Sequence, residues 1–171
     1  MSRLKNMKVL TTAAMLAAAG MILGFFKLPI SNIVEIRFTS LPIMIAGWLF
    51  GPAIGGVVGG LVDIGGYIIR PTGPYVPAFT LDTILTGVIF GFFLYKKKLS
   101  FKRVIIANVI NAGIVNLVLN TFWLSLLYKL PFVATFIARV PKECITIPLY
   151  TVVLYFIMKP VSQIRFVKTT M

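Results

Sequence analysis

The sequence predicts an all-α integral membrane protein, a bundle of six transmembrane helices that forms a single domain over residues 1–171. Three observations support this fold class. Hydrophobic residues make up 58% of the chain and charged residues only 12%, about half the charged share of a typical soluble domain. Apolar runs long enough to cross a hydrocarbon core of about 30 Å recur along the chain. Most basic residues lie in the short segments beside these runs.

The apolar runs define six expected membrane spans. Their approximate bounds are 8–28, 41–56, 57–70, 80–95, 104–127 and 138–158. The second and third spans form one nearly continuous apolar stretch, AGWLFGPAIGGVVGGLVDIGGY. We predict a tight cytoplasmic turn within it, because the Gly51-Pro52 step and the paired glycines that follow favour a break in the helix.

Charge placement predicts that both termini are cytoplasmic. Basic residues precede the first span, occupy KKKLSFKR (96–103) between the fourth and fifth spans, and follow the sixth span. With six spans these three segments lie on one side, and they hold 11 of the 17 basic residues and none of the four acidic ones. The positive-inside rule makes that side cytoplasmic, where segment 96–103 also contacts anionic membrane lipid. Topology thus explains most of the net charge of +13, and nothing beyond that charge supports nucleic-acid binding.

Several kinds of chemistry have no residues to carry them. The chain has no histidine, no GxSxG or P-loop motif, and only the carboxylates Glu35, Asp63, Asp82 and Glu143. The single cysteine, Cys144, cannot form a disulfide within the chain, and a cysteine-built metal site has no basis. We therefore predict no catalytic residue and no metal site. One enzymatic alternative stays open, an intramembrane enzyme that uses Asp63 and Asp82 on neighbouring spans.

The first span carries rows of small residues at four-residue spacing. Ala13 pairs with Ala17 and Ala14 with Ala18, so the helix has a smooth face that another helix can approach closely. The row serves either packing within the bundle or docking of a separate membrane subunit.

Six basic residues depart from the positive-inside pattern, because they fall on the outer side or in the outer thirds of the spans. They are Lys27, Arg37, Arg70, Lys129, Arg139 and Lys142. Charge at membrane depth is costly, so we interpret this layer as part of a site for an anion. Two punctuated outer segments, PISNIVEIRFTS (29–40) and RPTGPYVPAFT (70–80), adjoin it. They form either a lid over the site or ordinary surface connections.

The motif RVPKE near the start of the sixth span places three charges on one face. Arg139, Lys142 and Glu143 are spaced i, i+3 and i+4, and within a membrane such a face points to the bundle interior or a polar cavity. Pro141 predicts that the helix begins near Arg139 or Val140, since a first turn tolerates proline. The cluster then either binds a small anionic solute or forms an internal Arg139–Glu143 ion pair with Lys142 at the interface.

The fifth span adds amide groups at the same level. Asn116 and Asn120 share a face at i, i+4, and amides both donate and accept, as the edge of a heterocycle requires. Aromatic residues predicted nearby supply flat apolar walls; they are Tyr75, Phe79, Phe122 and Trp123. Hydrogen bonding between helices is the alternative role for the amides nearer the membrane centre.

These features together resemble the substrate-binding S components of energy-coupling factor (ECF) vitamin transporters, most closely their folate branch. The resemblance covers nearly the whole chain: six short spans, the alanine rows from Ala13 to Ala18, the block from RFTSLPIMIAGWLFGPAIGG to FLYKK (37–97), and ARVPKE (138–143). It implies a multi-pass protein of the bacterial cell membrane that captures a vitamin at the extracellular side. It also implies no enzymatic activity and no cofactor.

The resemblance further implies the partners of the chain. The first three helices would dock on a transmembrane coupling subunit driven by two cytoplasmic ATPase subunits, which hydrolyse ATP. Toppling of the S component in the membrane would then carry the vitamin inward. Alternatives that remain are an S component for another vitamin, the small membrane enzyme, and a structural bundle without a ligand.

Folate fits the chemistry of the candidate residues. Its pterin edge suits Asn120 and Glu143, its rings suit aromatic walls, and its glutamate tail suits arginine or lysine. The candidate substrate-binding residues are Arg37, Arg70, Tyr75, Phe79, Asn120, Trp123, Arg139, Lys142 and Glu143.

Overall fold

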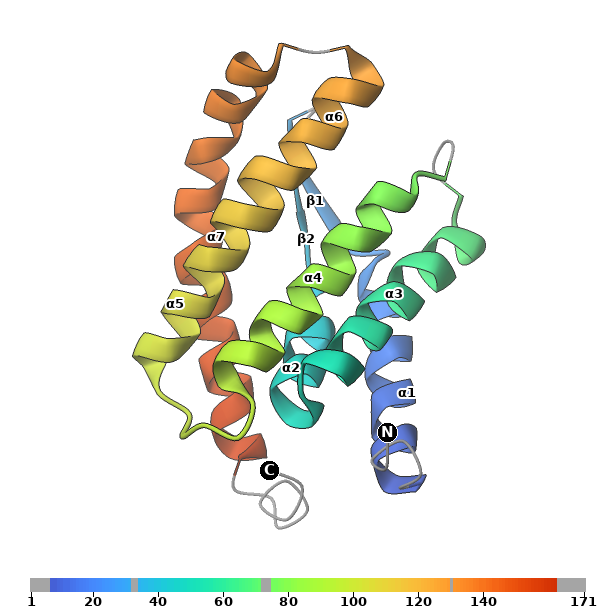
Figure 1. Ribbon diagram of the computed structural model, residues 1–171, viewed down its shortest axis with the longest axis vertical. Helices are drawn as coiled ribbons and strands as arrows, with labels where there is room; N and C mark the ends of the chain where they lie inside the picture. The colour runs from blue at the N-terminus through green and yellow to red at the C-terminus, as the bar shows by residue number, and fades with distance from the viewer. Residues whose placement is uncertain (1–6, 32–33, 72–74, 130, 163–171) are drawn as a thin grey trace.

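The computed structural model describes residues 7–31, 34–71, 75–129 and 131–162. Its helices form six membrane segments in the order of the predicted spans (Figure 1). The elements are α1 (Met7–Leu23), β1 (Lys27–Ser31), β2 (Val34–Arg37), α2 (Ser40–Phe50), α3 (Pro52–Ile69), α4 (Pro77–Leu94), α5 (Phe101–Asn111), the π-helix η2 (Ala112–Leu119), α6 (Asn120–Tyr128) and α7 (Phe132–Val161). The fifth segment is continuous through α5, η2 and α6.

The segments differ in length. Four are long and apolar enough to cross a membrane, namely Pro52–Ile69, Pro77–Leu94, Phe101–Leu127 and Phe132–Val161. The helices α1 and α2 are shorter, with 17 and 11 residues. At 1.5 Å per residue, α2 is only about 16 Å long. It lies in the interior of the bundle, where ten of its residues are buried, so α2 is enclosed by protein along most of its length.

The predicted break between the second and third spans is confirmed. Gly51 adopts a φ of 94°, a conformation that side chains rarely take, and separates α2 from α3. The Gly51 amide donates to the Gly47 carbonyl at 2.9 Å, and Pro52 occupies the first turn of α3, where no amide is needed.

A short hairpin lies outside the all-helical expectation. Strands β1 and β2 pair antiparallel, with Lys27 opposite Arg37 and Pro29 opposite Glu35. These strands connect α1 to α2 and overlap the predicted segment 29–40. Strand β2 contacts α7, so this connection packs back onto the bundle.

Helices α2, α3 and α4 approach each other through glycines. A Cβ built on Gly55 would lie 2.6 Å from both the Gly47 Cα and the Gly87 carbonyl oxygen. Real Cβ atoms do not approach backbone so closely, so these positions accept no side chain without separating the helices.

Gly55→Ala should therefore destabilise the bundle, since the new methyl group meets backbone atoms that cannot rotate away. We expect a loss of about 1–3 kcal/mol, seen as a drop of about 2–12 °C in the melting temperature of the detergent-solubilised protein. Gly66→Ala is the matched control in the same helix, because nothing lies within 4 Å of its built Cβ. Equal melting temperatures for the two variants would contradict this packing.

The last helix begins earlier than predicted. The helix α7 starts at Phe132 and keeps Pro141, Pro148 and Pro160 inside it. The expectation that Pro141 marks the first turn is wrong, because membrane helices tolerate an interior proline when neighbouring groups satisfy the freed carbonyl. Arg139 thus lies seven residues, about 10 Å, from the N-terminal end of α7.

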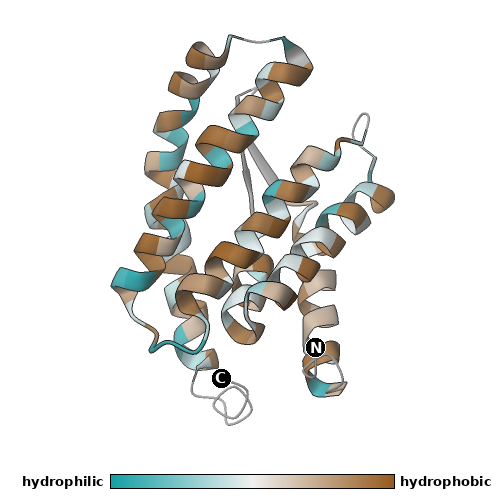
Figure 2. Cartoon of the chain, viewed as in Figure 1, coloured by the Kyte–Doolittle hydropathy of each residue, from teal (hydrophilic) through white to brown (hydrophobic). Residues whose placement is uncertain are grey.

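The start of α1, the segment 95–100 and the end of α7 lie at the same end of the molecule, and the hairpin lies toward the other (Figure 1). The helix ends that adjoin the three predicted basic segments therefore lie at one end of the molecule, while residues 1–6 and 163–171 of those segments lie outside the described residues. Hydrophilic turns interrupt the otherwise hydrophobic α7 and the α5–α6 segment (Figure 2). Those interruptions mark the polar site.

Candidate functional site: a buried polar layer between three helices

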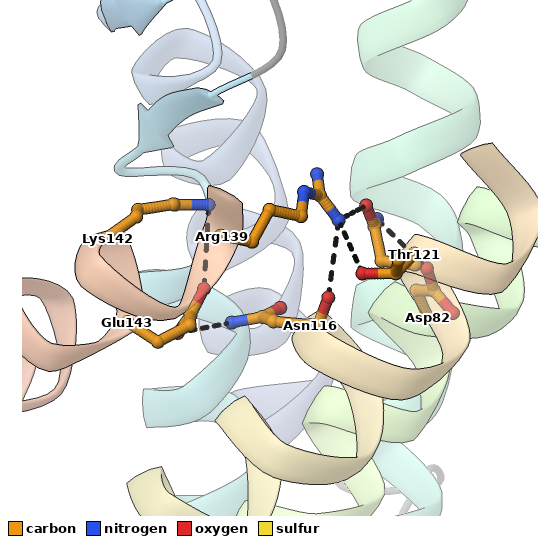
Figure 3. A network of polar contacts seen from close by, with 7 residues as sticks. Asp82, Asn116, Thr121, Arg139, Lys142 and Glu143 are labelled. Atoms are coloured by element: carbon orange, nitrogen blue, oxygen red, sulfur yellow. Dashed lines mark hydrogen bonds and ion pairs between the residues drawn. The ribbon is translucent and has the colours of Figure 1, made fainter. Parts of the chain in front are cut away.

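The centre of the site is Arg139, which projects from α7 toward α6 (Figure 3). Its side chain is 8% exposed. Its Nη1 donates to the Asn120 Oδ1 at 2.6 Å, to the Asn116 carbonyl oxygen at 3.3 Å and to the Thr121 hydroxyl at 3.5 Å. A buried guanidinium is thereby held by polar groups of one neighbouring helical segment.

The hydrogen bonds continue from Arg139 to a carboxylate on α4. The Asn120 Nδ2 donates to the Asp82 Oδ2 at 3.1 Å, and Asp82 is 5% exposed. Trp123 approaches the same carboxylate, although neither its Nε1 nor the Asp82 Oδ1 reaches hydrogen-bonding geometry with a residue in the described ranges. Two successive hydrogen bonds therefore join the buried Asp82 carboxylate on α4, through Asn120 on α6, to the buried Arg139 guanidinium on α7.

A second set of contacts surrounds Glu143, one turn below Arg139. Its Oε2 accepts from the Asn116 Nδ2 at 3.2 Å, and its Oε1 lies 3.6 Å from the Lys142 Nζ. The side chain of Glu143 is buried and that of Lys142 is 15% exposed. Lys142 is thus the cation paired with Glu143 in this structure, while Arg139 contacts the amides of the facing helix.

A small cavity lies beneath this layer. It has a volume of about 10 Å³, room for about one water molecule. Its polar lining includes Asn108, Asn111, Asn116, Glu143, Thr146 and Tyr150. The five-residue step from Asn111 to Asn116 falls on the π-helix η2, whose wider turn brings both amides to the same face.

A separate cluster lies near the end of α3 and the start of α4. The Thr80 hydroxyl donates to the Asp63 Oδ2 at 2.7 Å and lies 2.6 Å from the Tyr75 hydroxyl. The Tyr75 ring packs against that of Tyr67 with centroids 5.1 Å apart. Asp63 and Asp82 therefore have partners on different elements.

The structure brings only some of the predicted residues together. Asn120, Trp123, Arg139, Lys142 and Glu143 form the buried layer. Tyr75 and Phe79 stand where the α3–α4 connection meets α4, and Arg70 is exposed at the end of α3. Arg37 ends strand β2, but its side chain lies outside the described part of the structure, as do residues 72–74 of the predicted lid.

Sequence reasoning missed three contributors to the layer. The sequence pattern suggests Asp82 only as a candidate catalytic carboxylate, although a single acidic residue within an apolar span indicates a buried polar partner. Thr121 and Thr146 are buried polar residues of the same region, and threonines within a helix carry no comparable signal.

The four alanines of the first span divide into two pairs. Ala13 and Ala17 are buried against the bundle, whereas Ala14 and Ala18 are exposed. The exposed pair leaves a shallow stripe on the outer face of α1. Within the described ranges no group of three or more histidine, cysteine, aspartate or glutamate residues is placed to hold a metal.

Comparisons with known proteins agree with this architecture. Residues 8–158 match the family described as "ECF transporter, substrate-specific component". The folate transporter FolT of Clostridium novyi (strain NT) is 39% identical over 133 residues, covering 78% of this chain and 77% of the relative.

Two solved structures have the same fold. A crystal structure of FolT bound with folic acid superposes with a TM-score of 0.82 at 30% identity, covering 89% of this chain and 93% of that one. An S component for biotin from an ECF-type ABC transporter gives a TM-score of 0.70 at 28% identity, covering 93% and 95%. The chain belongs to the family of substrate-specific components of ECF transporters.

Proposed function

We propose that this chain is the high-affinity, membrane-embedded binding subunit for folate uptake by an ECF-type ABC transporter. The observation that carries the proposal is the buried layer in which Arg139 and Lys142 lie beside Asn116, Asn120 and Glu143. Cations at membrane depth are costly, so their presence there indicates a function, and binding an anionic vitamin is such a function. The likeness to FolT and to its complex with folic acid supports folate as that vitamin.

The layer offers a partner for each part of folate. Arg139 and Lys142 take the carboxylates of the glutamate tail, with the planar guanidinium suited to a two-bond contact. Glu143 recognises the donor groups of the pterin edge, while Asn120 holds the Arg139 guanidinium in place. The residues proposed to complete the pocket are Arg37, Arg70, Tyr75, Phe79 and Trp123.

The proposed orientation follows from the basic segments. Both termini and segment 96–103 are cytoplasmic, and the buried layer opens to the extracellular side. The chain acts as a single six-helix domain without enzymatic activity or cofactor of its own. It assembles through its first three helices with a transmembrane coupling subunit and two ATPase subunits that supply the energy.

A fluorescence titration of the purified protein with folate tests this proposal. The chain has two tryptophans. Trp48 on α2 is 1% exposed in the hydrophobic core, whereas Trp123 approaches Asp82 in the polar layer. A Trp48→Phe variant therefore reports from Trp123 alone. We expect saturable quenching by folate, and a protein whose Trp123 emission stays constant while labelled folate fails to bind would refute the proposal.

An S component for another vitamin is the second candidate, and the likeness to the biotin component motivates it. Biotin also carries a carboxylate, so Arg139 is compatible with either ligand. Competition for labelled folate by an excess of biotin distinguishes them. Displacement by biotin at lower concentration than by unlabelled folate would favour this second candidate.

A further inference from the structure

We propose that Asp82 is a positioning residue that orients Arg139 toward a carboxylate of the bound vitamin through the side-chain amide of Asn120. This inference rests on the proposed function and adds a residue outside the predicted pocket. Asp82 comes from α4, Asn120 from α6 and Arg139 from α7, and two successive hydrogen bonds join them. Figure 3 labels the two ends of this series, Asp82 and Arg139.

The chemistry of Asp82 and Arg139 determines which way the Asn120 amide points between them. An ionised carboxylate only accepts hydrogen bonds and a guanidinium only donates them. Between them, Asn120 has one orientation that satisfies both, with Nδ2 toward Asp82 at 3.1 Å and Oδ1 toward Arg139 at 2.6 Å. Turning the amide over would place two donors face to face beside Arg139.

Burial of both charged groups favours this single orientation of the Asn120 amide. Asp82 and Arg139 are 5% and 8% exposed, so water is a poor substitute for either contact. The three residues also come from three helices, and α4 packs mainly against α2 and α3 while α7 packs against α5 and α6. Asp82 therefore fixes Arg139 relative to the other half of the bundle.

Glu143 cannot take over this role. Its carboxylate is one turn away and is held by Lys142 at 3.6 Å and by the Asn116 amide at 3.2 Å. The Asn120 oxygen accepts from Arg139 at 2.6 Å, and Asp82 is the residue that holds this amide in place.

Asp82→Asn tests the inference, because it keeps the shape and removes the acceptor-only character. The Asn120 amide then loses the charged acceptor that anchors it to α4, and Arg139 loses its fixed direction. We expect the affinity for radiolabelled folate to fall about tenfold. The affinity for 6-hydroxymethylpterin, which has the ring system but no carboxylate, should stay within about twofold of the parent value.

Two further variants separate positioning from a general structural effect. Thr86→Val is the matched control on α4, since it removes the buried hydrogen bond from Thr86 to the Asp82 carbonyl oxygen at 2.9 Å and should leave the ratio of the two affinities unchanged. In an Arg139→Gln background, Asp82→Asn should have no further effect on folate binding, because the group that it positions is gone.

Equal weakening of folate and pterin binding by Asp82→Asn would overturn the inference, as would a full effect that persists without Arg139. Loss of folate affinity in Arg139→Gln with none in Asp82→Asn would reject the positioning role and leave the proposed function intact. A parent protein that binds neither ligand would reject the proposed function itself.

Discussion

Arg139→Gln is expected to lower folate affinity by about a hundredfold, because truncating one partner of a buried, hydrogen-bonded charge pair between protein and ligand costs about 2–5 kcal/mol of binding free energy. Glutamine keeps part of the length and one amide donor but has no charge for a carboxylate. The Asn120 oxygen, the Asn116 carbonyl and the Thr121 hydroxyl also lose their shared donor. Equilibrium binding of labelled folate to the purified variant measures the effect.

A matched control and a neighbouring variant sharpen this result. Lys102→Gln removes the same charge from an exposed position at the start of α5 and should leave folate affinity unchanged. Lys142→Ala should weaken binding about tenfold, as expected for one lost charge-assisted contact. Parent-like binding by both Arg139→Gln and Lys142→Ala would show that the cluster is structural.

Ligands without a carboxylate separate stability from recognition. If Arg139 contacts the glutamate tail, its replacement changes folate binding far more than binding of 6-hydroxymethylpterin. If Arg139 only holds the helices together, both ligands weaken alike and the melting temperature falls. The second pattern would transfer tail recognition to Arg37 or Arg70.

The six-segment bundle was predictable because hydrophobic length is the strongest signal that a membrane chain carries. The break at Gly51 was equally clear, since glycine followed by proline both permits a positive φ and starts a new helix. The grouping of Arg139 with Glu143 on one face followed from spacing alone. These features depend on residues near one another in sequence.

Features that depend on tertiary contacts were not predictable in the same way. The hairpin of β1 and β2 is only a few residues long, and its alternation is too short to distinguish from a loop. The position of Pro141 inside α7 depends on neighbours that stabilise the helix around it. No local sequence pattern predicts the π-helix η2. The hydrogen bond from Asn120 to Asp82 depends on how α6 packs against α4, which local sequence does not determine.

The exposed alanines of α1, Ala14 and Ala18, form the surface proposed to dock on the coupling subunit. Ala14 and Ala18 lie on the outer face of the helix, while Ala13 and Ala17 pack inward. A partner helix that approaches this row meets the methyl groups of Ala14 and Ala18, and close packing on small residues is a main source of helix association in lipid. The docking proposal for the coupling subunit therefore concerns the exposed pair.

Ala18→Trp and Ala14→Trp are each expected to abolish folate uptake and to leave folate binding within about twofold of the parent. The indole would hold the coupling subunit away from α1, whereas the vitamin layer between α4, α6 and α7 is untouched. Uptake of labelled folate by cells that express the complete ECF module, compared with binding to the purified variant, measures both. Leu126→Trp is the control, because Leu126 is 67% exposed on α6, away from the row. Parent-like uptake by both alanine variants would show that the coupling subunit docks elsewhere, and loss of uptake in Leu126→Trp would show that any added indole on the lipid-facing surface is harmful.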